Sequence, residues 1–446
     1  MAWGTRTVFI RGEFKAMEWL DRYFGISDKG SSVRTEILAG VATFLTMAYI
    51  IAVNPGILSG GGLDFGAVFV ATILAAAVGC LIMGFWAKWP VAMAPGMGLN
   101  AFFTFGVVLG MKQPWEVALG AVFVSGVLFL ILSLTGLREW VINSIPKSLK
   151  LGIGAGIGLF LAIIGLKNAG VMVDHPATLV GLGDIGSLPV LLFGLGFCVM
   201  VVLDRQKVPG GIIIGILIAS IIGWILGATE FQGVVGAVPS LEPTLLKLDI
   251  SGALTAAMIG IVFAFLFVDF FDTAGTLTSV ANLAGKVDAN GKVEGIGRAV
   301  VSDSIATIAG ALFGTSNTTS YIESGAGIKE GGRTGLTAVT VGVLFLLCLV
   351  FAPLAKSIPG YATGAALVFV ATHFMRNLLD IDWEDATEYA PAILAAVLMP
   401  LTFSIANGIA IGFIVYAIVK TASGRVSDTN PAVLLVAVLG VLHYVF

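Results

Sequence analysis

Two aspartates inside an apolar segment are the residues of this chain best suited to chemistry. Asp269 and Asp272 lie within the helix-length run from Met258 to Thr276, and Glu323 follows at a later hydrophobic interruption. An ionised carboxylate at bilayer depth costs several kcal/mol, so such groups are kept where they act on an ion or a polar solute. The three carboxylates therefore indicate a transport site.

The helix that carries the two aspartates also predicts a polar face. Asp269, Asp272 and Thr276 are spaced i, i+3 and i+7, which places them on one side of a helix. Asp303 lies near the start of a later apolar run, where we expect a helix cap or a loop-facing group. We assign no chemistry to the isolated histidines, which are His175, His373 and His443.

The composition requires lipid around most of the chain. Hydrophobic residues make up 57% and charged residues 11%, with a mean hydropathy of +1.00. These values are typical of a polytopic membrane protein. The net charge of -3 is spread over short loops, so no nucleic-acid partner is predicted. The carboxylates have no nearby nucleophile or metal cluster, so we predict neither an enzyme nor a bound metal or other cofactor.

The apolar runs predict about fourteen transmembrane segments. A crossing needs about 20 helical residues, and runs of suitable length occur at 37–58, 66–87, 115–134, 150–166, 188–203, 210–227, 254–276, 299–314, 335–355, 361–376, 389–403 and 405–420. Two more, 96–110 and 319–331, are interrupted by Gly, Pro or polar residues and reach about half-way across at ~1.5 Å per residue. The stretch 433–446 is either a short span or an interfacial helix.

The distribution of lysine and arginine supports this count and sets the orientation. With a cytoplasmic N-terminus and fourteen crossings, the inside segments receive 20 of the Lys and Arg residues and the outside segments receive four. This asymmetry follows the positive-inside rule. Omitting one of the broken segments would move every later loop to the other side. We therefore predict a multi-pass protein of the cell inner membrane whose N-terminus is cytoplasmic.

Two short sequence matches predict an internal repeat. Residues 126–130 recur at 342–346 as Gly-Val-Leu-Phe-Leu, and Ser-Ile-Pro at 144–146 recurs at 357–359. The matched spans are the fourth and the eleventh, and an odd displacement reverses their orientation. The pattern therefore predicts two inverted repeats of seven spans, a common arrangement in secondary transporters.

The same offset places the two broken segments opposite each other. Residues 94–100 and 314–320 are rich in Gly, Pro or polar residues, and each precedes a short apolar run. Extended backbone at membrane depth is tolerated only where it is buried in protein or lines a cavity. We therefore predict two half-helices, each preceded by a short extended segment, with their positive N-terminal ends near the midplane. The alternative is a pair of kinked packing helices.

Four motifs carry a resemblance to a known family. Residues 34–58, 94–103, 267–277 and 314–335 resemble the azaguanine-sensitive purine permeases. These belong to the nucleobase cation symporter superfamily, which includes the uracil and xanthine permeases. The resemblance covers most of the chain outside its two ends. It implies hypoxanthine, guanine or adenine as substrate, and the motif at 94–100 is more similar to the guanine/hypoxanthine branch.

The resemblance also implies a division into two domains. Residues 37–134 and 254–355 would form a core domain that binds the substrate, and residues 150–227 and 361–421 would form a gate domain. Residues 1–36 would be a cytoplasmic N-terminal segment, and residues 422–446 a C-terminal tail. A homodimer is left open as a partner, beside the lipid bilayer and the purine base.

By motif position, the resemblance implies that Asn100, Asp269, Asp272 and Glu323 bind the base. Glu323 would accept purine N–H groups, while Asn100 and half-helix amides would serve the carbonyl and ring nitrogens. The candidate site is completed by Gly98, Thr276, Thr319 and Ser320. The aromatic residues that could stack on the base are Phe102, Phe103 and Phe271.

The resemblance to the nucleobase cation symporters also implies that the base is transported together with a cation. A buried carboxyl on the span at 254–276, either Asp272 or Asp269, would carry a coupling proton. A sodium ion is the less favoured cation, for which Thr276 could supply an oxygen. Two other functions stay open: an adenine permease of the same family, and an anion transporter of the same architecture, which the acidic site disfavours.

Overall fold

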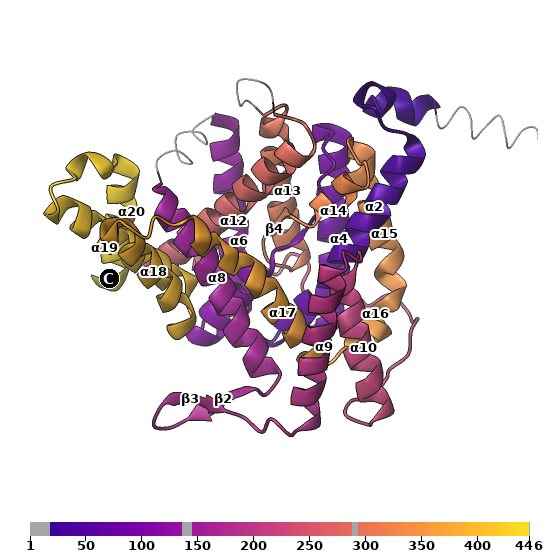
Figure 1. The fold of residues 1–446 in the computed structure, drawn as a ribbon, viewed down its shortest axis with the longest axis horizontal. Coiled ribbons are helices and arrows are strands. Elements are labelled where there is room, and N and C mark those ends of the chain that lie inside the picture. Colours follow the sequence, from indigo (N-terminus) through magenta and orange to yellow (C-terminus); the bar gives the residue numbers. More distant parts are fainter. Residues whose placement is uncertain (1–17, 136–144, 288–292, 446) are drawn as a thin grey trace, which may run out of the picture.

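Helices form most of the described chain, and two small strand pairs interrupt them (Figure 1). The computed structural model describes residues 18–135, 145–287 and 293–445. Of the predicted inside positions, residues 1–17, Arg138 and Lys292 lie outside this range. The first half of the chain contains η1 (Ser27–Lys29), α2 (Val33–Met47), α3 (Ile50–Ser59), α4 (Phe65–Ile82), η2 (Met83–Ala87), β1 (Met93–Pro95), α5 (Met97–Ala101), η3 (Phe102–Gly110), α6 (Trp115–Thr135), α8 (Lys147–Asn168), β2 (Met172–His175), β3 (Leu179–Leu182), α9 (Leu188–Arg205) and α10 (Gly211–Ile225).

The second half has the same character and ends in a helix. It contains α11 (Ile250–Ala253), α12 (Ala256–Leu283), α13 (Ile296–Phe313), β4 (Thr318–Ser320), α14 (Ser324–Lys329), α15 (Gly335–Leu347), η4 (Cys348–Phe351), α16 (Ala352–Ser357), α17 (Gly360–Met375), η5 (Arg376–Asp380), α18 (Ala386–Leu401), α19 (Ile405–Ala422), η6 (Val426–Asp428) and α20 (Pro431–Val445). The helical polytopic fold predicted from the sequence is therefore confirmed.

Nine helical stretches of the described chain are long and apolar enough to cross a membrane, and three shorter apolar helices join them. The shorter ones include Met97–Gly110, the first predicted half-span. The total of fourteen crossings and the inverted repeat stay predictions. Of the stretch left open above, residues 433–445 belong to α20, which packs against α19.

Three predicted spans differ in detail from the helices observed. The span 37–58 is split into α2 and α3, with Ala48 and Tyr49 at the break. The aspartate-bearing helix α12 does not end at Thr276 but continues to Leu283, for 28 residues. The span 335–355 changes from α-helix to the 3-10 helix η4 at Cys348 and then continues as α16. The break in the first span matters most, because it brings Tyr49 to the site described below.

The helices pack as two groups. In the first, α4 lies against α13 and α15, α6 lies against α12 and α13, and α2 lies against α15. In the second, α8 lies against α17 and α18, α9 lies against α10 and α17, and α18 lies against α19. Glycines allow the second group to pack closely: a Cβ at Gly152 would lie 2.4 Å from the carbonyl oxygen of Ala392, and one at Gly158 would lie 2.6 Å from Phe374 Cβ. The glycine-rich start of α8 thus serves close helix packing.

Candidate functional site

The two extended segments predicted from the sequence pair with each other near the centre of the molecule (Figure 1). Strands β1 and β4 are antiparallel, with Met93 opposite Ser320 and Pro95 opposite Thr318. Two further backbone bonds extend the pair, from Tyr321 N to Ala92 O and from Gly96 N to Asn317 O, each 2.9 Å. The pairing supplies partners for polar backbone groups that lipid could not satisfy.

Each strand leads into a short helix. After β1 the chain forms α5, five residues long, which continues as the π-helix η3. After β4 it forms α14, which has six residues and follows Glu323 at its N-cap. The second half-helix is thus shorter than the predicted range 319–331, and Thr319 and Ser320 belong to the strand. A helix dipole grows with the number of aligned peptide groups, so the short helix α14 contributes only a weak electrostatic field at its N-terminus. Side chains must therefore supply most of the polar groups that a ligand could contact there.

A cavity of about 820 Å³ lies where the strand pair, α12 and the two short helices meet α8 and α17. The predicted site residues that line it are Gly98, Asp272, Thr276, Thr319, Ser320 and Glu323. Asn100 and Asp269 do not line it. The cavity extends outwards to the exposed residues Asp204, Lys207, Lys329 and Glu330. These lie in segments that the charge distribution assigns to the inside, so the opening faces the predicted cytoplasmic side.

Glu323 is held in place by a tyrosine from the break in the first span. Tyr49 Oη donates a hydrogen bond of 2.7 Å to Glu323 Oε1. A second phenol, that of Tyr321, lines the same cavity and donates to the carbonyl oxygen of Pro95 at 2.6 Å. The Glu323 carboxylate thus faces the cavity with its orientation fixed at one oxygen. Neither tyrosine was predicted as a site residue, although an aromatic residue before Glu323 and one in the first span were visible signals.

Asp272 and Asp269 are separated by one helical turn but have different surroundings. Asp272 lines the cavity, and its Oδ2 accepts a hydrogen bond of 3.3 Å from Thr319 Oγ1. Asp269 lies behind the strand pair, where its Oδ2 accepts from Thr307 Oγ1 at 3.0 Å and from Asn317 Nδ2 at 2.8 Å. The predicted common face is therefore present, but only one of its aspartates reaches the cavity.

Asn100 is also buried behind the cavity lining. Its Oδ1 accepts a hydrogen bond from the Ser316 hydroxyl, and its Nδ2 has no hydrogen-bond partner. The expected cap at Asp303 is wrong. Asp303 is fully buried in α13, and its Oδ1 accepts from the Ser320 backbone N–H and from the Ser320 hydroxyl, both at 2.7 Å. The reason is that α13 begins at Ile296, two turns before this residue, so Asp303 lies within the helix.

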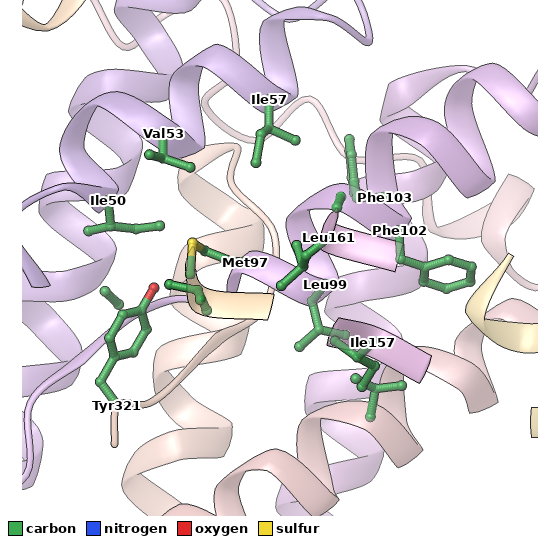
Figure 2. Close-up of a cluster of buried hydrophobic side chains, with 14 of the residues drawn as sticks. Ile50, Val53, Ile57, Met97, Leu99, Phe102, Phe103, Ile157, Leu161 and Tyr321 are labelled. Carbon is green, nitrogen blue, oxygen red and sulfur yellow. The ribbon is translucent and has the colours of Figure 1, made fainter. Parts of the chain in front are cut away.

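The aromatic residues near the cavity differ from those expected. Phe102 and Phe103 are buried in the hydrophobic cluster, on the opposite side from Tyr321 (Figure 2), and Phe102 packs on Phe265 with ring centroids 5.0 Å apart. Phe271 stacks on Phe267 instead. None of the three expected rings lines the cavity; Phe369 and Phe374 of α17 do.

One of the histidines set aside above also lines the cavity. His373 lies on α17 beside Phe369, with ring centroids 4.9 Å apart and its Nδ1 3.2 Å from the Phe369 carbonyl oxygen. If Nδ1 carries the proton in that contact, Nε2 is free to accept one. His373 was not predicted at the site, because nothing in its own span identifies the helix face that meets the first group of helices.

The cavity combines apolar walls with acidic groups that have no cationic partner. Within the described ranges, the ion pairs involve Lys29, Lys420 and Arg425, and none of them includes a cavity carboxylate. The same residues contain no group of His, Cys, Asp and Glu arranged to hold a metal ion. Such a site suits a flat, neutral molecule with N–H donors along its edge.

The comparisons with known proteins agree with this chemistry. A family model of xanthine and uracil permeases, described as "Permease family", matches residues 34–411. The adenine permease AdeP of Escherichia coli strain K12 is 45% identical over 427 residues, which cover 96% of each chain. The guanine/hypoxanthine permease PbuG of Bacillus subtilis strain 168 is 44% identical over 436 residues, which cover 95% of this chain and 99% of the relative.

Solved structures share the fold at low sequence identity. The transmembrane domain of a cyanobacterium bicarbonate transporter, BicA, superposes with a TM-score of 0.64 at 16% identity and covers 84% of this chain and 96% of its own. The structure of SLC26A9 superposes with a TM-score of 0.65 at 12% identity and covers 94% of this chain and 70% of its own. At these identities the likeness concerns the fold alone.

Proposed function

Since this chain belongs to the permease family that includes the xanthine and uracil permeases, we propose that it imports a purine base together with protons. The family and the relatives are permeases and not enzymes, and the chain is a multi-pass membrane protein. Guanine or hypoxanthine is the proposed substrate. The observation that carries this proposal is the Glu323 carboxylate, oriented by Tyr49 in the cavity without a cationic partner.

A purine fits this arrangement by its hydrogen-bonding edge. Hypoxanthine and guanine carry N–H groups that a carboxylate accepts, and charge-assisted bonds of this kind are stronger than neutral ones. In this proposal the base contacts Glu323, Asp272, Thr319, Ser320, Gly98 and Thr276. Asn100 and Asp269 lie behind the lining, where they hold the strand pair or reach the base only in another conformation.

The choice between the branches of the family rests on the motif at residues 94–100. Overall identity does not separate them, because adenine and guanine/hypoxanthine permeases are similarly close to this chain. Uptake of radiolabelled hypoxanthine, guanine and adenine in a permease-deficient strain tests the proposal. Saturable hypoxanthine uptake that guanine competes would support it. Uptake of adenine alone would support the adenine permease, and uptake of none would contradict purine transport.

The two packing groups suggest how transport proceeds. We assign residues 37–134 and 254–355 to a core that carries the base, and residues 150–227 and 361–421 to a gate against which the core moves. A Cβ at Gly98 would lie 2.5 Å from Ile157 Cγ2, so the two groups already touch beside the cavity.

We further propose that the protein lies in a cell inner membrane with its N-terminus in the cytoplasm. Whether it forms a homodimer is tested by the mass of the purified protein.

The coupling proton gives a prediction about the driving force. A protonophore that collapses the pH gradient is expected to stop accumulation of the base, because the carboxylates then receive no net flow of protons. Replacing sodium by choline is expected to leave the rate of uptake unchanged. The measurement is initial uptake into cells or vesicles under each condition. A requirement for sodium would contradict proton symport, since Asp272 and Thr276 would then be candidates for a metal-ion site.

The two classes of phenylalanine predict different defects. Phe369→Ala removes a ring from the cavity wall and is expected to raise the KM for the base by roughly tenfold, since an aromatic contact of this kind contributes about 1 kcal/mol or more. Phe102→Ala removes a ring from the buried cluster and is expected to lower the melting temperature with little change in KM. The reverse pattern would place the stacking residue on η3.

A further inference from the structure

Behind the cavity, α12 and α13 place an aspartate and a threonine opposite each other in reciprocal order. Asp269 and Thr273 are one turn apart on α12, and Asp303 and Thr307 are one turn apart on α13. Thr307 Oγ1 donates to Asp269 Oδ2 at 3.0 Å, and Thr273 lies beside the Asp303 carboxyl. We call these four residues the Asp/Thr box. None of the four residues lines the cavity in which the base is proposed to bind.

The Asp/Thr box is buried, and no ion pair of the described residues places a positive charge on it. Asp269 is 1% exposed and the other three side chains are 0% exposed. Asp269 Oδ1, Asp303 Oδ2 and the Thr273 hydroxyl have no hydrogen-bond partner. The hydrogen-bond donors that reach the two carboxyls come from neutral groups of Thr307, Asn317 and Ser320.

Two buried negative charges without compensation would be strongly unfavourable. Burying a charge costs several kcal/mol unless a partner of opposite charge is present. The titratable groups that face the box are Asp269 and Asp303 themselves and Asp272, one turn along α12, all of them acidic. None of the ion pairs in the described part of the chain reaches it. The pair therefore needs a cation.

We propose that the Asp/Thr box is the binding site of the coupling cation, separate from the base site, and that the cation is a proton shared by Asp269 and Asp303. The inference rests on the proposed function. Two neighbouring carboxyls in a buried site can hold one proton between them, because both cannot ionise together. A hard metal cation needs about six oxygen ligands or more. The described residues contain no group of His, Cys, Asp and Glu arranged to hold a metal ion, which favours the proton.

The strand β4 connects the Asp/Thr box to the cavity. Ser320 lines the cavity, and both its backbone N–H and its hydroxyl donate to Asp303 Oδ1. Thr307 Oγ1 accepts from the Thr318 N–H at 3.2 Å and lies 3.1 Å from the Thr318 carbonyl oxygen, which is an alternative to Asp269 as acceptor for its single proton. A change in the charge of Asp269 or Asp303 changes the strength of the hydrogen bonds that hold β4 in place. Proton binding and base binding are thereby linked, and the linkage must act in both directions.

Asp303→Asn tests the proposal in reconstituted vesicles. The amide has the shape of a protonated aspartate and keeps an acceptor for Ser320, so we expect counterflow of radiolabelled hypoxanthine with a KM within about threefold of wild type. With one proton per base, an inward gradient of one pH unit drives up to about tenfold accumulation in wild type. The variant is expected to show none. Asp184→Asn, the same change in an exposed turn, is the control and should accumulate the base normally.

A second variant covers the case in which Asp303→Asn fails to fold. Asp269→Asn is expected to lose accumulation as well, and the double variant should be no worse than either single variant, because the two residues share one proton. Infrared spectra of the purified protein without any base should contain a deuterium-sensitive band of a protonated carboxyl that Asp269→Asn and Asp303→Asn each change. This test needs no substrate, so it separates failure of the box from failure of the proposed function. Unchanged spectra, continued accumulation by Asp303→Asn, or accumulation that requires sodium would each overturn the proposal.

Discussion

Glu323→Gln is expected to lower the affinity for the purine by roughly 30-fold to 1,000-fold while the protein stays in the membrane. In wild type the carboxylate faces the cavity, with Oε1 held by Tyr49 Oη at 2.7 Å. The amide replaces one acceptor by a donor, which then faces a donor on the purine edge. Losing a charge-assisted hydrogen bond and leaving a donor unsatisfied costs roughly 2–4 kcal/mol.

The measurement is the KM of uptake, with the amount of protein in the membrane determined by immunoblot. Glu330→Gln is the matched control, because this glutamate lies at the exposed rim of the same cavity. Its KM is expected to stay within about threefold of wild type, since exposed charges contribute little. Wild-type affinity in Glu323→Gln would show that Glu323 serves structure alone, and the proposed base site would then be lost.

Gly327→Ala is expected to destabilise the protein by roughly 3 kcal/mol and to abolish transport. A Cβ at this position would lie 2.3 Å from the carbonyl oxygen of Ala39 and 2.3 Å from Thr43 Oγ1. The carbonyl belongs to the backbone of α2 and cannot move aside as a flexible side chain would. The added methyl group must therefore displace α14 from α2, and Glu323 at the start of α14 moves with it.

Melting temperature in detergent and uptake in vesicles both report on this change. Gly325→Ala in the same short helix is the control for stability, because its Cβ would meet only Leu283 Cδ1, at 3.4 Å. Its effect on stability is expected to stay within about 0.5 kcal/mol. Equal melting temperatures for the two variants would show that close approach to α2 does not hold α14 in place.

Several features of the fold were predictable because they follow from local chemistry. Apolar runs long enough to cross the bilayer form the long helices. The polar interruptions at residues 94–100 and 314–320 mark the places where the helical ladder stops, since Gly, Pro and hydroxyl residues favour other backbone conformations there. Backbone groups at that depth need partners, so the two interruptions had to be buried together. The structure shows how: they pair as β1 and β4.

The depth and direction of polar side chains were less predictable. Asp269 and Asp272 share a helix face, yet only Asp272 lines the cavity, because Asn317 and Thr307 from other elements cover Asp269. Asp303 was expected at a helix end and is instead buried in α13. The phenylalanine rings at the cavity come from α17 and not from η3 or α12, because the orientation of each ring depends on which helix packs opposite.

The sequence by itself determined that this chain crosses a membrane many times and that two of its segments are broken, and it predicted Asp269, Asp272 and Glu323 as the acidic groups of a transport site. Each of these follows from the cost of placing polar groups in hydrocarbon, which depends on residue type and spacing. Only the tertiary structure decided which neighbours each carboxyl has. Tyr49 reaches Glu323, and Ser320 reaches Asp303, because helices distant in sequence meet at the strand pair. Such contacts depend on packing across the whole bundle, which no local pattern encodes.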